Sequence, residues 1–240
     1  MRLHHLTRQG LPLVLAAAGF SVFCASPVLA QVPPTPAQVS QYKGLHAAAQ
    51  RGDVPKVEKL IAQKVDLNTR DEQGRTPLHV ATFARQVPVV KLLAQAGADL
   101  SAMENDKYDA VTIAAVADDE ATLATLLALG ASAKLTTSRY DGTALIAAAH
   151  LGHDGVVRQL IAAGAPLDHV NNLHWTAAIE SVVLGDGGPR HQQTLRALID
   201  AGANLQLTDR QGNTPLQLAR TRGYREMVLM LEQASAQAKR

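Results

Sequence analysis

The chain has 240 residues, of which 47% are hydrophobic, 18% are charged and only 3% are aromatic. This composition indicates a folded protein with an aliphatic core, and the abundance of Ala and Leu favours closely packed helices over aromatic-rich strands. The formal net charge of +2 excludes a strongly basic chain whose affinity comes from nucleic-acid phosphates, and a single cysteine excludes a disulfide framework or a cysteine-based zinc site.

The first thirty residues differ from the rest and predict a secretory signal peptide. Residues 1–10 carry Arg2 and Arg8 and no acid, residues 11–23 are mostly apolar, and Val28-Leu29-Ala30 places small residues before a cut after Ala30. The alternatives are an uncleaved membrane anchor, for which the apolar run is short against the roughly 20 residues of a span, and lipidation at Cys24.

Cleavage after Ala30 would change the charge balance of the chain. Residues 1–30 hold two of the 23 basic residues and no acid, so 21 basic residues would face the 21 acidic ones, and the only cysteine would be removed. Such a thiol-free chain suits an oxidising compartment, and we expect a periplasmic location more than a secreted one. Residues 31–40 contain three prolines and predict a stiff, extended Pro-rich linker without a helix.

From residue 41 onward the sequence repeats itself. The segment Thr76-Pro77-Leu78-His79-Val80-Ala81 recurs as Thr214-Pro215-Leu216-Gln217-Leu218-Ala219. With four degenerate copies, the segments start at residues 43, 76, 109, 143, 176 and 214, at steps of 33, 33, 34, 33 and 38. A second marker, Gly97-Ala98-Asp99, recurs at 130, 164 and 202. On these residues the chain resembles the ankyrin-repeat family over about residues 41–236.

The resemblance implies an all-α ankyrin-repeat solenoid. It would hold about six stacked helix-turn-helix repeats with short hairpin loops, in a domain of residues 41–240 with repeats starting near 41, 71, 104, 138, 171 and 209. Thr76 can cap the first helix of its repeat and Pro77 suits the first helical position. Gly152 can end such a helix in the left-handed conformation. Arg85 and Asp118 stand at the matching place and predict strained turns there.

The fifth repeat is five residues longer than the usual period. The extra residues fall near Gly185–Pro189, between its two helices. No Lys-Ser or Lys-Thr pair follows this glycine run, so a phosphate loop is disfavoured and we expect a flexible surface loop. Insertions in repeats often lie on a binding face.

The sequence contains no G-x-S-x-G, H-E-x-x-H or C-x-x-C signature, and we therefore expect no enzymatic activity, no catalytic residue, no cofactor and no bound metal. The family resemblance assigns His46 and His79 a structural hydrogen bond. The alternative hypothesis is a metal-binding or enzymatic protein that uses His150 and His153 near the insertion of the fifth repeat.

The remaining candidate is a protein-binding surface. The resemblance implies a groove formed by hairpin tips and inner helices, and three aromatic residues fall on tips, where Tyr, Trp and Arg often anchor interfaces. Most charged residues of segment 99–120 are acidic, and most charged residues of segment 209–240 are basic. This uneven distribution of charge would steer a charged partner. The predicted partner-binding residues are Arg75, Phe83, Tyr108, Tyr140, His150, Trp175 and Asn213.

We expect a monomer that binds a periplasmic or secreted protein, with no nucleic acid partner and no stable membrane insertion after cleavage. A specific hypothesis, which rests on the family and the compartment, is that the protein restrains or protects an exported enzyme, as an inhibitor, an immunity protein or an accessory factor. A purely structural scaffold and a secreted effector are the other possibilities.

Overall fold

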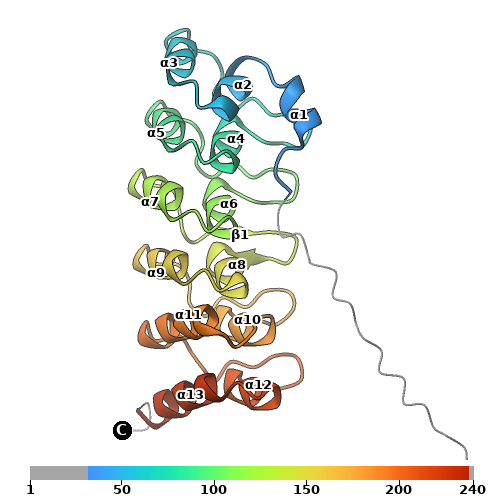
Figure 1. Ribbon diagram of the computed structural model, residues 1–240, viewed down its shortest axis with the longest axis vertical. Helices are drawn as coiled ribbons and strands as arrows, with labels where there is room; N and C mark the ends of the chain where they lie inside the picture. Colours follow the sequence, from blue (N-terminus) through green and yellow to red (C-terminus); the bar gives the residue numbers. More distant parts are fainter. Residues whose placement is uncertain (1–31, 238–240) are drawn as a thin grey trace, which may run out of the picture.

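The computed structural model describes residues 32–237, so the predicted signal peptide lies outside the described residues. Within this range the structure contains thirteen helices and one two-stranded hairpin, and twelve of the helices form six pairs stacked along the long axis of the molecule (Figure 1). The helices are α1 (Pro36–Gln41), α2 (Gly44–Arg51), α3 (Val54–Ala62), α4 (Pro77–Phe83), α5 (Val87–Gln95), α6 (Ala110–Val116), α7 (Glu120–Ala128), α8 (Ala144–Leu151), α9 (Asp154–Ala162), α10 (Ala177–Val183), α11 (Pro189–Asp200), α12 (Pro215–Arg222) and α13 (Arg225–Gln237).

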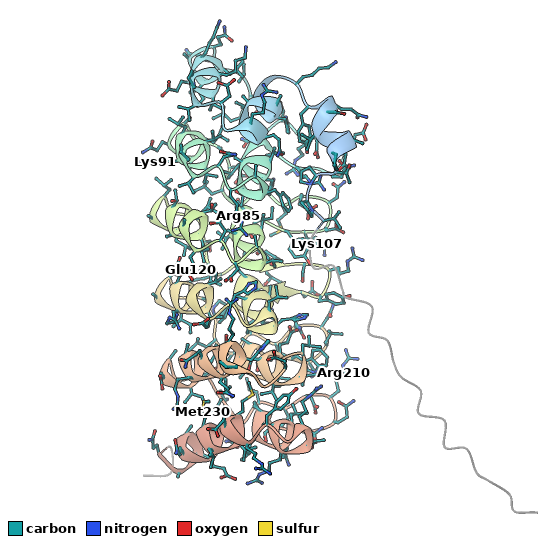
Figure 2. All side chains as sticks on the ribbon, viewed as in Figure 1. Arg85, Lys91, Lys107, Glu120, Arg210 and Met230 are labelled. Atoms are coloured by element: carbon teal, nitrogen blue, oxygen red, sulfur yellow. The ribbon has the colours of Figure 1, made fainter. Side chains whose placement is uncertain are left out.

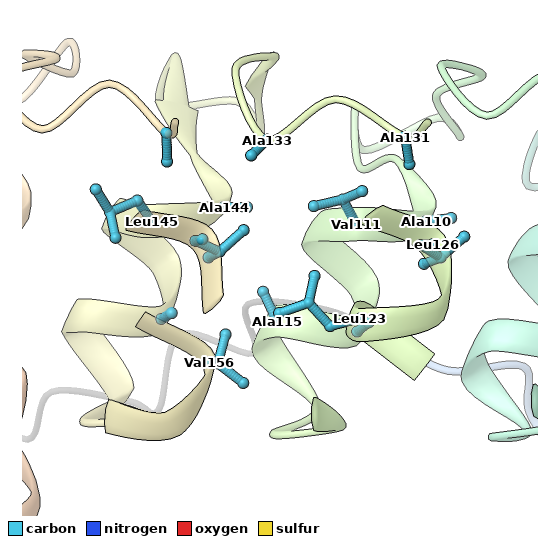
Figure 3. Packing of buried hydrophobic residues seen from close by; sticks show 14 of the residues in the cluster. Ala110, Val111, Ala115, Leu123, Leu126, Ala131, Ala133, Ala144, Leu145 and Val156 are labelled. Atoms are coloured by element: carbon cyan, nitrogen blue, oxygen red, sulfur yellow. The ribbon is translucent and has the colours of Figure 1, made fainter. Parts of the chain in front are cut away.

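The helices form two rows. The inner row, α2, α4, α6, α8, α10 and α12, lies next to the hairpin loops, and the outer row, α3, α5, α7, α9, α11 and α13, lies on the far side (Figure 1). The core runs without interruption between the rows and from repeat to repeat. Figure 3 shows Ala115, Leu123 and Val156 meeting where the third and fourth repeats stack, and all three are fully buried. Each repeat therefore depends on its neighbours for its core, which confirms the expected all-α solenoid.

Helix starts follow the predicted capping pattern. The Thr76 hydroxyl accepts a hydrogen bond from the backbone N–H of His79, and the Asp109 carboxylate accepts one from that of Thr112 at 2.8 Å. Each cap satisfies a backbone donor that has no partner within its helix. At the other end of these inner helices Gly152 has φ +69°, and Arg85 and Asp118 adopt the same left-handed region at +54° and +52°. The strained turns predicted in repeats two and three are confirmed.

The hairpin loops join one another through their backbones. Strands β1 (Thr136–Thr137) and β2 (Gly142–Thr143) pair antiparallel within one loop. The amide of Ser138 in this loop donates to the carbonyl of Lys107 at 2.9 Å, and the amide of Asn172 donates to the carbonyl of Tyr140 at 2.9 Å. Three successive loops are thereby fixed in one row, whose ends toward the solvent are called the tips below.

The Pro-rich linker contains a helix, so the prediction of an extended, non-helical segment is wrong. Helix α1 spans Pro36–Gln41, and Thr35 and Gln38 form a reciprocal capping box. The physical reason is the position of the prolines. Pro33 and Pro34 precede the helix, and Pro36 occupies its first residue, where a missing N–H removes no intrahelical bond.

The two ends of the stack have polar outer faces, as expected for terminal repeats. Lys56 and Lys59 of α3 are exposed, as are Arg225 and Glu226 of α13. Across residues 32–237 every helix is too short or too polar to cross a membrane.

Candidate functional site

The inner row presents a mixed surface beside the tips. Phe83, Val116, His150 and Val183 occupy the same position of α4, α6, α8 and α10, and all four are half-buried. Leu184, which directly follows α10, is 42% exposed. The surface predicted for partner binding therefore combines half-buried apolar side chains with one imidazole.

Three predicted aromatic residues lie on neighbouring tips. Tyr140 is 36% exposed, and Tyr108 and Trp175 are half-buried. Arg139, beside Tyr140, pairs with Asp106 of the preceding tip at 2.7 Å. Because the backbones of these tips are hydrogen-bonded together, the three rings belong to one rigid row, which suits a preorganised interface.

Arg75 differs from the expectation that it faces a partner. Its side chain is 4% exposed, because residues 32–41 lie against it. The guanidinium donates to the carbonyl of Val32 at 2.8 Å and to the side-chain oxygen of Gln38 at 3.3 Å. It also lies 5.6 Å from the centre of the Phe83 ring. The sequence carries no local signal for this contact, since Gln38 and Val32 precede Arg75 by 37 and 43 positions.

Asn213 is hydrogen-bonded within its own tip. Its side-chain amide lies 3.1 and 3.2 Å from the two carboxylate oxygens of Asp209, and its backbone N–H donates to one of them at 2.8 Å. The amide is therefore engaged within the loop, which makes Asn213 a weaker candidate for partner binding than the three aromatic residues.

Glu180 is a polar residue of the inner row that sequence reasoning missed. It lies on α10, is 5% exposed, and accepts a hydrogen bond from the Asn171 side chain at 2.8 Å. Burial raises the pKa of Glu180 to about 7. His150 Nδ1 lies 3.6 Å from the second carboxylate oxygen of Glu180. Burial lowers the pKa of His150, since it disfavours the charged form of both groups. The available signal was the acid itself, at a position where other repeats carry Val80 or Leu218.

Asn171 explains part of this arrangement. Its side-chain oxygen accepts from the backbone N–H groups of Leu173 and Trp175, the role that Asp71 performs in the second repeat. An amide that accepts in this way still needs an acceptor for its own N–H, and Glu180 supplies it.

The longer loop of repeat five is fastened to its surroundings, contrary to a free surface loop. The Tyr224 hydroxyl donates to the carbonyl of Gly185 at 2.8 Å, and the Gln192 amide donates to that of Gly187 at 2.8 Å. His191 Nε2 donates to the carbonyl of His150 at 2.9 Å. The loop thus lies beside His150, as the alternative metal hypothesis required.

The imidazoles near this loop make structural contacts. His153 Nδ1 lies 2.9 Å from the carbonyl of Ala115, and His191 Nδ1 lies 2.8 Å from the Asp186 carboxylate. Among residues 32–237, His, Cys, Asp and Glu side chains form no group of three that could hold a metal ion. The geometry offers no support for a metal site at His150 and His153.

The acidic segment 99–120 is largely used inside the structure. Asp109 and Asp119 cap helices, and Glu104 accepts from the backbone N–H groups of Asp106 and Tyr108. Asp106 itself pairs with Arg139. Most of these carboxylates are therefore engaged in internal hydrogen bonds, but backbone donors do not remove their negative charge, so the segment keeps most of its acidic character.

Comparisons with known proteins agree with this architecture. Models of ankyrin repeats match residues 33–104, 140–172 and 189–232. The chain is 36% identical to the ankyrin repeat protein YahD of Escherichia coli K12 over 190 residues. This alignment covers 79% of this chain and 94% of YahD.

Solved structures give the same result. An ankyrin repeat domain from Acinetobacter baumannii is similar with a TM-score of 0.76 and 44% identity, over 80% of this chain and 97% of that one. A chain in the complex of a predatory endopeptidase from Bdellovibrio bacteriovorus with an immunity protein is similar with a TM-score of 0.67 and 26% identity, over 80% and 98%. Taken with the six stacked helix pairs, these similarities place the chain in the ankyrin-repeat family.

Proposed function

We propose that the chain is an exported, non-catalytic module that binds a protein partner through its tips and inner helices. The observation that carries the proposal is the rigid row of tips bearing Tyr108, Tyr140 and Trp175 beside half-buried apolar residues of the inner row. Aromatic side chains on a preorganised backbone bury large areas at a small entropic cost, and such residues dominate the binding energy of protein interfaces.

We infer that the partner is an exported enzyme, which this chain restrains or protects. Two observations support this inference: the predicted signal peptide, and the similarity to a chain of a complex that contains an endopeptidase and an immunity protein. The expected location is the periplasm. Cell fractionation tests it, because a secreted effector would accumulate in the medium instead.

The binding surface is tested by replacing Trp175 and Tyr108 together with Ala. The double variant should fail to capture from a periplasmic extract the protein that the unaltered chain captures. With that protein purified, its affinity should fall at least a hundredfold, since each aromatic anchor contributes about 2 kcal/mol or more.

The matched control for this experiment is Lys91→Ala. Lys91 lies on α5 in the outer row, far from the tips (Figure 2). It should bind as the unaltered chain does, and both variants should keep the helical circular-dichroism signal. Capture that survives the double substitution would show that the partner binds elsewhere.

A further inference from the structure

Residues 32–41, called the cover below, lie against the tip of the second repeat and outside the two helix rows. Figure 1 shows α1 beside the first loops of the stack. Within the described residues, both hydrogen bonds that join the cover to the repeats come from Arg75, one to the Val32 carbonyl and one to the Gln38 side chain. The cover is thus a short segment of the chain seated on a single arginine.

The contact between the cover and the repeats is slight. No residue of α1 is buried, and Val32 is 48% exposed. Arg75 Nε is buried without a hydrogen-bond partner, which is unfavourable for a charged group. Segments that bury few apolar side chains open at low free energy, while the fold beneath them stays intact. The cover is therefore built to detach without unfolding the stack.

The chain continues from the cover into a firm attachment. Tyr42 packs against the core, and its hydroxyl donates to the Asp71 carboxylate at 2.8 Å. Detachment would therefore stop at Tyr42 and leave the first repeat in place.

The surface beneath the cover has the composition of an interface anchor. Arg75 lies over the Phe83 ring, and Phe83 belongs to the half-buried inner row. An arginine stacked on an aromatic ring, next to a row of apolar side chains, is a frequent centre of binding energy. Both residues were predicted to contact a partner, and in the structure the cover occupies hydrogen-bonding positions of Arg75 that a partner would use.

We propose that Arg75 and Phe83 form a peptide-binding site that the cover occupies reversibly in cis. The ligand class is a short proline-containing segment that starts extended and continues into a helical turn, with a backbone carbonyl in the first part and a side-chain amide oxygen in the second placed for the guanidinium. Pro33 and Pro34 stiffen the extended part before the helix, and the capping box of Thr35 and Gln38 favours the helical turn, so the segment loses less conformational entropy on docking. The inference rests on the proposed function in one respect. A protein partner bound to the tips and inner helices can contact Arg75 of the second repeat only after it displaces the cover.

The first test uses the cover as a probe. In one variant of the full chain, residues 32–41 are replaced by ten Gly and Ser residues. A fluorescein-labelled peptide with the sequence of residues 32–41 should bind this variant saturably in fluorescence anisotropy. Arg75→Ala in the same background should weaken binding at least tenfold. Arg139→Ala should not, although Arg139 pairs with Asp106 on its tip much as Arg75 Nη1 lies 3.7 Å from the Asp71 carboxylate.

Two outcomes would overturn the proposal: no saturable binding to a Gly-Ser variant with unaltered circular dichroism, or equal binding to the Arg75→Ala variant. Because Arg75 is buried, its loss could disturb the fold. The peptide with Gln38→Ala changes no folded chain and should also bind at least threefold more weakly. Equal binding of that peptide would remove Gln38 from the site and contradict the proposed geometry.

Hydrogen exchange in the unaltered chain measures reversibility. The amide of Val39, which is bonded to the Thr35 carbonyl within the cover, should exchange at least a hundredfold faster than that of Val80 in α4. Equal protection would make the cover a permanent part of the fold. Neither measurement involves the partner, so their failure would leave the Trp175 and Tyr108 test of the proposed function intact.

Discussion

At the scale of single residues, His79 shows how a buried side chain ties the repeats together. The Thr76 backbone N–H donates to His79 Nδ1 at 3.0 Å, and His79 Nε2 donates to the carbonyl of Ala102 in the next loop at 2.9 Å. The ring must therefore be neutral, with its proton on Nε2. Burial lowers the pKa of His79 to about 4, because a charged imidazole would lose its hydration.

This depressed pKa predicts an acid-sensitive fold. Unfolded chains bind a proton at His79 below its ordinary pKa of about 6.5, whereas the folded chain resists protonation down to about 4. The stability that His79 contributes is therefore complete above pH 6.5 and is lost as the pH falls toward 4. Over this window the loss is roughly 3 kcal/mol. Urea denaturation at pH 7.5 and pH 4.5 measures it.

The control for this prediction is His79→Gln, which should remove the roughly 3 kcal/mol of pH dependence that His79 contributes and leave that of His150, whose pKa burial also lowers. Gln217 holds the same position in the last repeat and forms the same capping box with Thr214. Glu180 titrates with the opposite sign, since its raised pKa makes stability fall as the pH rises through about 4.5 to 7. Both chains are therefore compared in a Glu180→Gln background. An unchanged slope in His79→Gln would refute the role of this histidine.

At the scale of the helices, the ends of the outer row follow one rule with one exception. Gly97, Gly130, Gly164 and Gly202 follow α5, α7, α9 and α11 with φ between +79° and +95°. After α3 the same place is occupied by Lys64, with φ +55°. A side chain in the left-handed region is strained, because its Cβ crowds the backbone carbonyl.

Lys64→Gly should therefore stabilise the protein. The relief of strain is about 1–2 kcal/mol, and the greater freedom of glycine in the unfolded chain offsets part of it, so we expect a net gain of roughly 0.5–1 kcal/mol. Thermal or urea denaturation measures the change. The matched reverse substitution is Gly97→Ala, where an added Cβ meets no atom within 4 Å, so its destabilisation would report backbone strain alone. A loss of stability in Lys64→Gly would contradict this account.

At the scale of the entire stack, the position of a repeat determines how much its buried residues contribute to the free energy of global unfolding. Helix α11 packs between α9 and α13 and fully buries Leu195 and Leu198. Helix α13 is the last of the outer row, and of its residues Met227 and Leu231 are buried. An interior repeat is held by two neighbours and a terminal one by a single neighbour, so the terminal repeat is the first to detach.

The two leucines should consequently behave differently when shortened. Leu195→Ala should lower the free energy of global unfolding by about 2–5 kcal/mol, as expected for a cavity in a shared core. Leu231→Ala should mainly speed hydrogen exchange in residues 214–237 and leave that of α4 and α6 unchanged. Hydrogen exchange followed by mass spectrometry separates the two cases. Uniformly faster exchange along the whole stack in Leu231→Ala would show that the array unfolds as one unit instead.

The repeat architecture follows from the amino-acid sequence alone. Caps such as Thr76 and left-handed turns such as Gly152 depend on residues only a few positions apart. The period near 33 residues is visible as a regular recurrence of these local features along the chain. The positions of Phe83 and Trp175 followed from that register, whereas the helix at Pro36–Gln41 was missed because prolines were weighed by number and not by position.

Which polar side chains are free depends on contacts between residues that are distant in the sequence. Arg75 meets Val32 across 43 positions, and Arg190 pairs with Asp118 across 72. Such contacts arise because stacking brings distant turns together, and no local pattern encodes them. The repeat register signals the burial of Glu180, but its approach to His150 of the preceding repeat depends on how the repeats stack. A side chain's hydration, and with it its charge and its availability to a partner, is set by the neighbours that the stack supplies.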